Sequence, residues 1–81
     1  MGNENIQLSE IAIAPTSFTD QIQLIGNEKV NLLEIISADG KSVIKQKNPE
    51  AIIYTGSLPA GIYIFRLHTD GDIKVIKGLK Q

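Results

Sequence analysis

Short apolar segments alternate with turn-forming residues along the whole chain. The segments recur about every ten residues, and none keeps a helical period over the length that a helix needs. This spacing predicts an all-β fold, either a sandwich or a barrel. The expected strands lie at 5–9, 10–15, 20–25, 30–37, 42–47, 51–55 and 61–69, and an eighth run at 73–79 completes the set if the first is only an arm.

The position of apolar side chains within these runs predicts how each strand is buried. In DQIQLI, Ile22 and Leu24 alternate with polar residues, as expected of a strand with one face in water. The strand 30–37 is apolar on both faces and should be central. From Ile6 to Ile13 the apolar positions change from even to odd, which predicts a bulge or break near Ser9–Glu10.

Three turn signals divide the second half of the chain. ADGK at 38–41 and TDGD at 69–72 each place an Asp-Gly pair between two apolar runs, which predicts hairpins with type I′ turns and positive φ. LPAG at 58–61 predicts a further β-turn. Pro59 fixes the φ of the first central position, and Gly61 can take the last position of the turn or adopt a positive φ without a steric penalty.

The strand after LPAG has the clearest division between its two faces. Tyr63, Phe65 and Leu67 share one face, which we expect to be a main part of the core. The opposite face begins with the apolar Ile62 and ends with His68, the only histidine, which we expect to be solvated.

Length and composition restrict the range of functions. A chain of 81 residues with 42% hydrophobic and 21% charged residues fits one small globular domain. We assign residues 11–81 to a single β-domain and residues 1–10 to an N-terminal arm or linker that can include a first strand. The net charge is −1 with scattered basic residues, so nucleic acid is not an expected partner. Cysteine is absent, which excludes disulfides and cysteine-based metal sites.

No group of residues in the sequence predicts catalysis. One histidine cannot form a multi-histidine metal site, and no serine lies in a G-x-S-x-G motif. The D-G-D at 70–72 lacks the further oxygen ligands of a calcium loop and is interpreted as a turn. We therefore expect no enzyme activity, no metal and no cofactor. Tyr54 and Tyr63 offer only weak support for a carbohydrate site.

The lysines of the last run allow two interpretations. Lys74, Lys77 and Lys80 can protect an edge strand from pairing with other chains, or they can form a stripe that docks on a receptor. The sequence pattern alone leaves both open.

The order of these motifs resembles the C-terminal sorting domain of the type IX secretion system of Gram-negative Bacteroidota, also called the Por secretion system tail domain, type A. The resemblance runs from about Ile11 to Lys80. LPAGIYIFRLHTDGDIKVIKGLK is similar to the family's Leu-Pro-Ala-Gly-Ile-Tyr motif, apolar strand, turn and basic closing strand. LEIISADGKSVIKQ is similar to its strand, Gly-Lys turn and strand unit. In IAIAPTSFTDQIQL, Pro15 and Phe18 match the family's opening Pro and Phe, while Thr16-Ser17 replaces its Asn-Pro.

The resemblance implies an immunoglobulin-like antiparallel β-sandwich of about seven strands that is not an enzyme. Such a domain directs an N-terminal cargo through the secretion machinery of the outer membrane to the cell surface or medium. A sortase-like surface peptidase then removes it, here by a cut expected upstream of Ile11. The chain would be an excised tail or a stand-alone relative. The motif and recognition candidates are Pro15, Phe18, Gly40, Lys41, Leu58, Pro59, Gly61, Tyr63, Lys74, Lys77 and Lys80.

Two alternatives remain beside a sorting domain. The chain can be a structural or adhesive β-sandwich module of a surface protein, with a homodimer formed through an exposed edge strand. A small carbohydrate-binding module is the other, and it requires an exposed aromatic platform.

Overall fold

The computed structural model describes residues 11–26 and 28–81. The N-terminal arm at 1–10, the expected strand 5–9 and the bulge near Ser9–Glu10 lie outside the described residues. In the part that is described, the only regular elements are β-strands, so the all-β prediction is confirmed. No helix there is long or apolar enough to cross a membrane.

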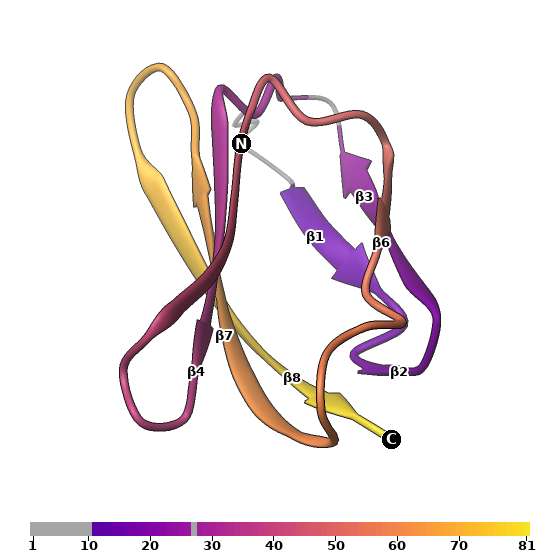
Figure 1. Ribbon diagram of the computed structural model, residues 1–81. Helices are drawn as coiled ribbons and strands as arrows, with labels where there is room; N and C mark the ends of the chain where they lie inside the picture. The colour runs from indigo at the N-terminus through magenta and orange to yellow at the C-terminus, as the bar shows by residue number, and fades with distance from the viewer. Residues whose placement is uncertain (1–10, 27) are drawn as a thin grey trace, which may run out of the picture.

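The described residues form eight strands in two sheets, which pack face to face as a sandwich (Figure 1). One sheet has three strands in the order β1-β3-β6, and the other has five in the order β2-β8-β7-β4-β5. The strands are β1 (Ile11–Ala14), β2 (Ser17–Phe18), β3 (Gln21–Gly26), β4 (Leu32–Ser37), β5 (Ser42–Lys47), β6 (Ile52–Tyr54), β7 (Gly61–His68) and β8 (Ile73–Lys80).

The strand order confirms the immunoglobulin-like sandwich. All pairs are antiparallel except β2 with β8, where Ser17 and Phe18 run parallel to Leu79 and Lys80. The first strand of the fold is thus divided between the two sheets, because the chain leaves β1 and crosses to the other sheet through a cis peptide bond before Pro15. β4 lies between β7 and β5, as its two apolar faces predicted.

The core lies between the two sheets and comes from the predicted strand faces. Phe65 and Leu67 are fully buried and Tyr63 nearly so, which confirms the core face of β7. On β3, Ile22 is buried and Leu24 packs against the core from a partly exposed position. The buried apolar residues are Ile11, Ile13, Phe18, Ile22, Val30, Leu33, Ile35, Ile53, Leu58, Tyr63, Phe65 and Leu67.

Both Asp-Gly hairpins form, but neither uses a type I′ turn. In the β4–β5 hairpin the Gly40 amide donates to the Ser37 carbonyl (2.9 Å) and the Ser37 amide donates to the Lys41 carbonyl (2.8 Å). Gly40 has φ +91°, whereas Asp39 does not have a positive φ. The loop is therefore a type I turn followed by a left-handed glycine, and only that one position requires glycine. In the β7–β8 hairpin Gly71 does not have a positive φ either, and the Thr69 amide donates to the Asp72 carbonyl (2.9 Å).

The LPAG segment crosses from one sheet to the other between β6 and β7. The hydrogen-bonded turn of this connection spans Thr55–Leu58, three residues before the predicted turn at 58–61, because the Leu58 amide donates to the Thr55 carbonyl (3.0 Å). Thr55 is fully buried and fixes this corner to the loop before β3. Its amide donates to the Asp20 carbonyl (2.7 Å), and its hydroxyl donates to the Thr19 carbonyl (3.1 Å).

Candidate recognition surface

The motif residues around LPAG form a fixed corner rather than an exposed site. The hydroxyl of Tyr63 donates to the carbonyl of Pro59 (2.6 Å), so the buried ring has its polar group satisfied. This is the tyrosine corner of immunoglobulin-like sandwiches, in which a tyrosine at the start of a strand bonds to the backbone a few residues upstream. Gly61 has φ +149°, a positive value like the one that the sequence allowed for this glycine. Leu58 is buried.

The aromatic side chains of the opening and closing motifs meet in the core. Phe18 lies edge-on to Phe65, with ring centroids 5.5 Å apart and planes at 77°, and its centroid is 6.5 Å from that of Tyr63. A Cβ atom at Gly78 would lie 2.8 Å from the Phe65 ring and 3.0 Å from the Phe18 ring. The absence of a side chain at Gly78 therefore makes room for both rings, and sequence analysis did not identify this role.

Five of the eleven recognition candidates are thus structural. Phe18, Leu58 and Tyr63 are in the core, and Gly40 and Gly61 hold turn conformations. Pro15, Lys41, Pro59, Lys74 and Lys77 are exposed, and Lys80 is half-buried.

The three lysines of β8 do not form a stripe. Lys74 is paired with Leu67 and Lys80 with Gly61, which places them on the core-facing side of the sheet, whereas Lys77 is paired with Ile64 on the outer side. β8 is also not a free edge along its whole length, since its last two residues pair with β2. The predicted docking stripe of three lysines is therefore wrong, and only Lys77 of the three belongs to the outer face.

The outer face of the five-stranded sheet carries an apolar patch at the end where β7 begins and β8 ends. Ile62 and Leu79 are paired there, and they are 47% and 46% exposed. Ile64 on β7 and its partner Ile36 on β4 are half-buried and extend the patch toward β5. Val43 on β5 is the last residue of the patch, and it is 41% exposed. We call these five residues the outer patch.

Two hollows flank the centre of the outer patch. One, of about 320 Å³, is lined by residues of β8 and the β1–β2 link together with Ile62. The other, of about 420 Å³, lies between the β4–β5 turn and the LPAG corner and is also lined by Ile62. Ile62 therefore stands between two depressions, with Lys77 at the rim of the first.

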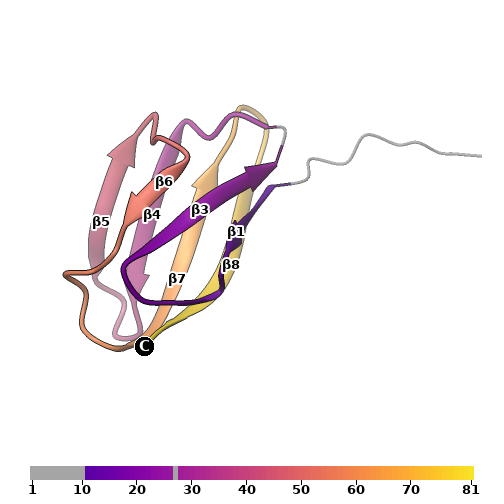
Figure 2. The same ribbon diagram turned by 90° about the vertical axis from the view of Figure 1, so that its right-hand side faces the viewer.

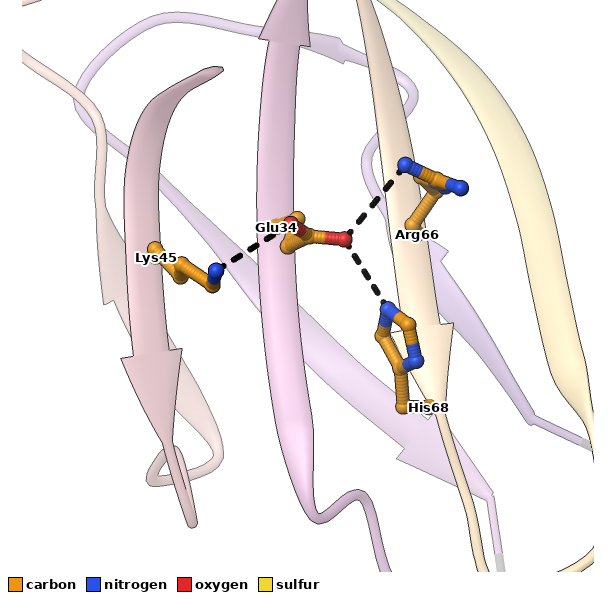
Figure 3. A network of polar contacts seen from close by, with 4 residues as sticks. All are labelled: Glu34, Lys45, Arg66 and His68. Atoms are coloured by element: carbon orange, nitrogen blue, oxygen red, sulfur yellow. Dashed lines mark hydrogen bonds and ion pairs between the residues drawn. The ribbon is translucent and has the colours of Figure 1, made fainter.

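A charged row crosses the outer face next to the patch, centred on Glu34 of β4 (Figure 3). One carboxylate oxygen of Glu34 lies 3.0 Å from Nε2 of His68 and 3.6 Å from a guanidinium nitrogen of Arg66. The other lies 3.9 Å from Nζ of Lys45. Glu34 has 14% of its side chain exposed, whereas Lys45 and Arg66 are far more exposed. His68 is thus hydrogen-bonded to Glu34, and only a quarter of its side chain is exposed, which corrects the expectation of a solvated histidine.

These contacts act on the ionisation of the glutamate. The hydrogen bond with His68 lowers the pKa of Glu34 most, partial burial opposes it, and the charges of Arg66 and Lys45 lower it further. The Glu34 carboxylate therefore keeps its charge to a lower pH than an isolated glutamate does.

The described residues bring neither acidic side chains nor the two tyrosines together into a site. No three metal-binding side chains gather anywhere in 11–26 and 28–81. Asp70 and Asp72 make separate contacts, the first accepting from the Asn31 amide group (2.7 Å) and the second from the Ile73 amide (2.8 Å). Tyr63 is buried, so only Tyr54 of the two tyrosines is exposed, and the aromatic platform of a carbohydrate-binding module is not formed by this pair.

The sequence contained signals for part of this surface. The odd spacing between Lys74 and Lys77 already places them on opposite faces of one strand. The charged row had a weaker signal, because a glutamate in an otherwise apolar strand predicts cationic neighbours without saying which ones.

Fold and surface together define the class of protein: an immunoglobulin-like β-sandwich with an unpartnered apolar and cationic outer face among its described residues. No protein-family model matches the chain, and no curated protein matches it either.

Proposed function

We propose that this chain is a secretion-targeting domain of the type IX kind, which directs an N-terminal cargo through the outer-membrane machinery and is then cleaved. The observation that carries the proposal is the outer patch. Its apolar centre, Ile62 and Leu79, lies on β7 and β8, the two strands that form the longest motif resembling that family. The proposed partners are the secretion machinery and a sortase-like surface peptidase, and the destination is the cell surface or medium.

The outer patch has the composition of a docking site. Contiguous exposed apolar side chains with a charged rim are typical of surfaces that bind other proteins. Ile62 and Leu79 supply the apolar centre, and Lys77 supplies a positive charge beside it. The buried motif residues, among them Tyr63 and Phe18, then serve recognition only by keeping this surface in shape.

A reporter fusion tests the proposal. Residues 1–81 are placed behind a reporter that carries an export signal, and surface delivery is compared between cells with and without the type IX machinery. Delivery is expected only where the machinery is present. Equal surface delivery in a machinery-null strain would contradict the proposal.

A matched pair of variants locates the docking site. Ile62→Ser should reduce delivery, because it removes the apolar centre of the outer patch. Ile73→Ser is the control, since Ile73 is 48% exposed on the same strand pair but lies at the other end of the face. Both purified variants should have melting temperatures close to that of the wild type. Equal delivery by the two variants would remove the outer patch from the proposal.

A structural or adhesive surface module is the second candidate, because the same patch can be covered by a neighbouring domain or by a second copy. In that case the domain stays attached to its mature protein. The intact mass of the native surface protein, with these residues included, would favour it over cleavage, and sedimentation of the purified chain would detect a homodimer.

A further inference from the structure

Two unpaired strand edges lie on the same side of the sandwich, away from β1 and β8 (Figure 2). β5 is the last strand of the five-stranded sheet and β6 is the last strand of the three-stranded sheet, so neither has an outer partner among the described residues. A hollow of about 470 Å³ is lined by residues of both strands and of the loop that joins them, among them Gln46, Lys47, Ile52 and Tyr54.

The free edge of β5 has backbone groups without a strand partner. The pairing of β5 with β4 continues to Asn48, whose amide donates to the Asn31 carbonyl (2.8 Å). Because antiparallel strands alternate their hydrogen-bonding direction, the amides and carbonyls of Lys45 and Lys47 point away from β4. Val43 follows at a register shift, where Ile36 pairs with Ser42 and Val43 has no Cα partner on β4. Such a row is a template for an added strand.

We propose that this edge binds an extended segment of a partner protein as a sixth strand of the sheet, and that the segment carries acidic residues at alternate positions. Lys45 and Lys47 are two residues apart on β5, so both side chains lie on its outer face, and both are exposed. Side chains on an added strand would lie directly opposite them, where opposite charges stabilise the pairing. Next to Val43 the segment needs an apolar residue.

The lysines distinguish this occupant from a second copy of the chain. If the β5 strands of two copies pair antiparallel so that the outer faces of the two sheets are continuous, outer-face residues of one strand stand opposite outer-face residues of the other. One such register sets Lys45 against Lys45, and another sets Lys45 against Lys47. Like charges directly opposite destabilise a strand pair, so the edge disfavours itself and favours an acidic strand.

The hollow gives the added strand a second contact. Its inward side chains would lie beside Gln46 and above the space bordered by Ile52 and Tyr54. Tyr54 is 72% exposed, the highest value among the large apolar and aromatic residues of the described chain. A rigid aromatic ring at the rim is the kind of side chain that anchors binding partners.

This binding site goes beyond the export function and does not depend on it. The apolar centre of the outer patch, Ile62 and Leu79, is at the start of β7 and the end of β8, whereas strand addition uses the backbone of β5, and Val43 is the one residue that belongs to both. The purified chain alone is sufficient for the test, so a failure of export and a failure of peptide binding are separate results.

The test is a peptide titration of the isotope-labelled 81-residue chain followed by NMR. The probe is acetyl-Thr-Glu-Thr-Glu-Thr-Val-Thr-amide, which sets its glutamates opposite Lys47 and Lys45 and its valine opposite Val43 in an antiparallel pair. Binding with a dissociation constant below about 1 mM is expected. The amides of Val43, Lys45 and Lys47 should shift, and at ten times that constant their hydrogen exchange should slow about tenfold.

Two charge variants and one control peptide test the chemistry. Lys47→Glu should weaken binding about fivefold or more, while Lys77→Glu, on the same face at the far side of the sheet, should leave it unchanged. A peptide with the same composition but adjacent glutamates should bind more weakly than the probe, because it turns one carboxylate toward Gln46.

A proline variant tests the backbone. Lys45→Pro removes an amide that points away from β4, a place where edge strands tolerate proline, and Lys45→Ala controls for the lost charge. Binding should be lost in the proline variant and retained, more weakly, in the alanine variant. If Lys45→Pro does not fold, the contrast between Lys47→Glu and Lys77→Glu still decides the result.

Three outcomes would overturn the proposal. One is the absence of shifts at the Val43, Lys45 and Lys47 amides up to about 1 mM probe. Another is equal binding of the probe and the control peptide. The third is protection of these amides that grows with protein concentration without peptide, which would make a second copy the occupant.

Discussion

Replacing Gly78 by alanine should destabilise the protein, although glycine in a strand is ordinarily the weaker residue. The added Cβ atom would lie 2.8 Å from Cε1 of Phe65, 3.0 Å from Cε1 of Phe18 and 3.3 Å from the carbonyl oxygen of Thr16. Phe65 and Phe18 are 0% and 1% exposed, so neither ring can turn into solvent. The backbone of β8 must therefore move away from the core, or the aromatic pair must separate.

Two opposing terms set the size of the effect. Alanine in place of a strand glycine gains roughly 0.5–1 kcal/mol from the reduced entropy of the unfolded chain. Overpacking a filled core costs about 1–3 kcal/mol. The net loss should be about 1–2 kcal/mol, which lowers the melting temperature of a domain of this size by roughly 5–15 °C.

Urea and thermal unfolding followed by circular dichroism measure the loss. Gly71→Ala is the matched control, because nothing lies within 4 Å of its added Cβ atom and its φ is not positive. Combining Gly78→Ala with Phe18→Leu should restore part of the stability relative to the sum of the single changes, since the two sites share one space. The packing argument is refuted if Gly78→Ala is as stable as the wild type or as Gly71→Ala.

Three further changes test the core, the corner and the charged row. Phe65→Ala should cost about 3–5 kcal/mol and leave little folded protein, and a melting temperature within a few degrees of the wild type would contradict its core role. Tyr63→Phe should cost about 1 kcal/mol in urea unfolding, because the Pro59 carbonyl loses its donor, whereas exposed Tyr54→Phe should cost nothing measurable. The lowered pKa of Glu34 means that the folded state releases this proton at a lower pH than the unfolded state does. Its stabilising contribution is therefore complete above the unfolded value, about 4.3, and is lost as pH falls through the folded pKa. Stability measured from pH 7 to pH 3 should fall less steeply in Glu34→Gln, and parallel curves would exclude this source.

Local patterns were enough to predict most of the fold. The expected strands 42–47 and 61–69 match Ser42–Lys47 and Gly61–His68 within one residue, because alternation and turn residues act over short stretches of chain. The core face of β7 followed from the same alternation.

Long-range pairing was the main source of the errors. β2 has only two residues, and it exists as a strand because Ser17 and Phe18 reach β8, more than sixty positions later in the chain. The charged row depends in the same way on the register that brings Lys45 and Arg66 beside Glu34. No pattern within one segment contains that information. The role of Gly78 is another case, since it follows from two rings that belong to other strands.

The charged row also restricts how a partner can use the outer face. A partner that covers the whole face must remove water from Glu34 and from its contacts Lys45, Arg66 and His68, which costs energy unless the partner supplies new polar contacts. A partner that covers only the outer patch avoids that cost, because the row stays hydrated beside it. If the sorting proposal holds, Glu34→Gln should therefore leave surface delivery near the wild-type level at neutral pH while Ile62→Ser reduces it. Delivery of the same reporter by both variants measures this. An equal loss in the two would mean that the partner covers the row as well as the patch.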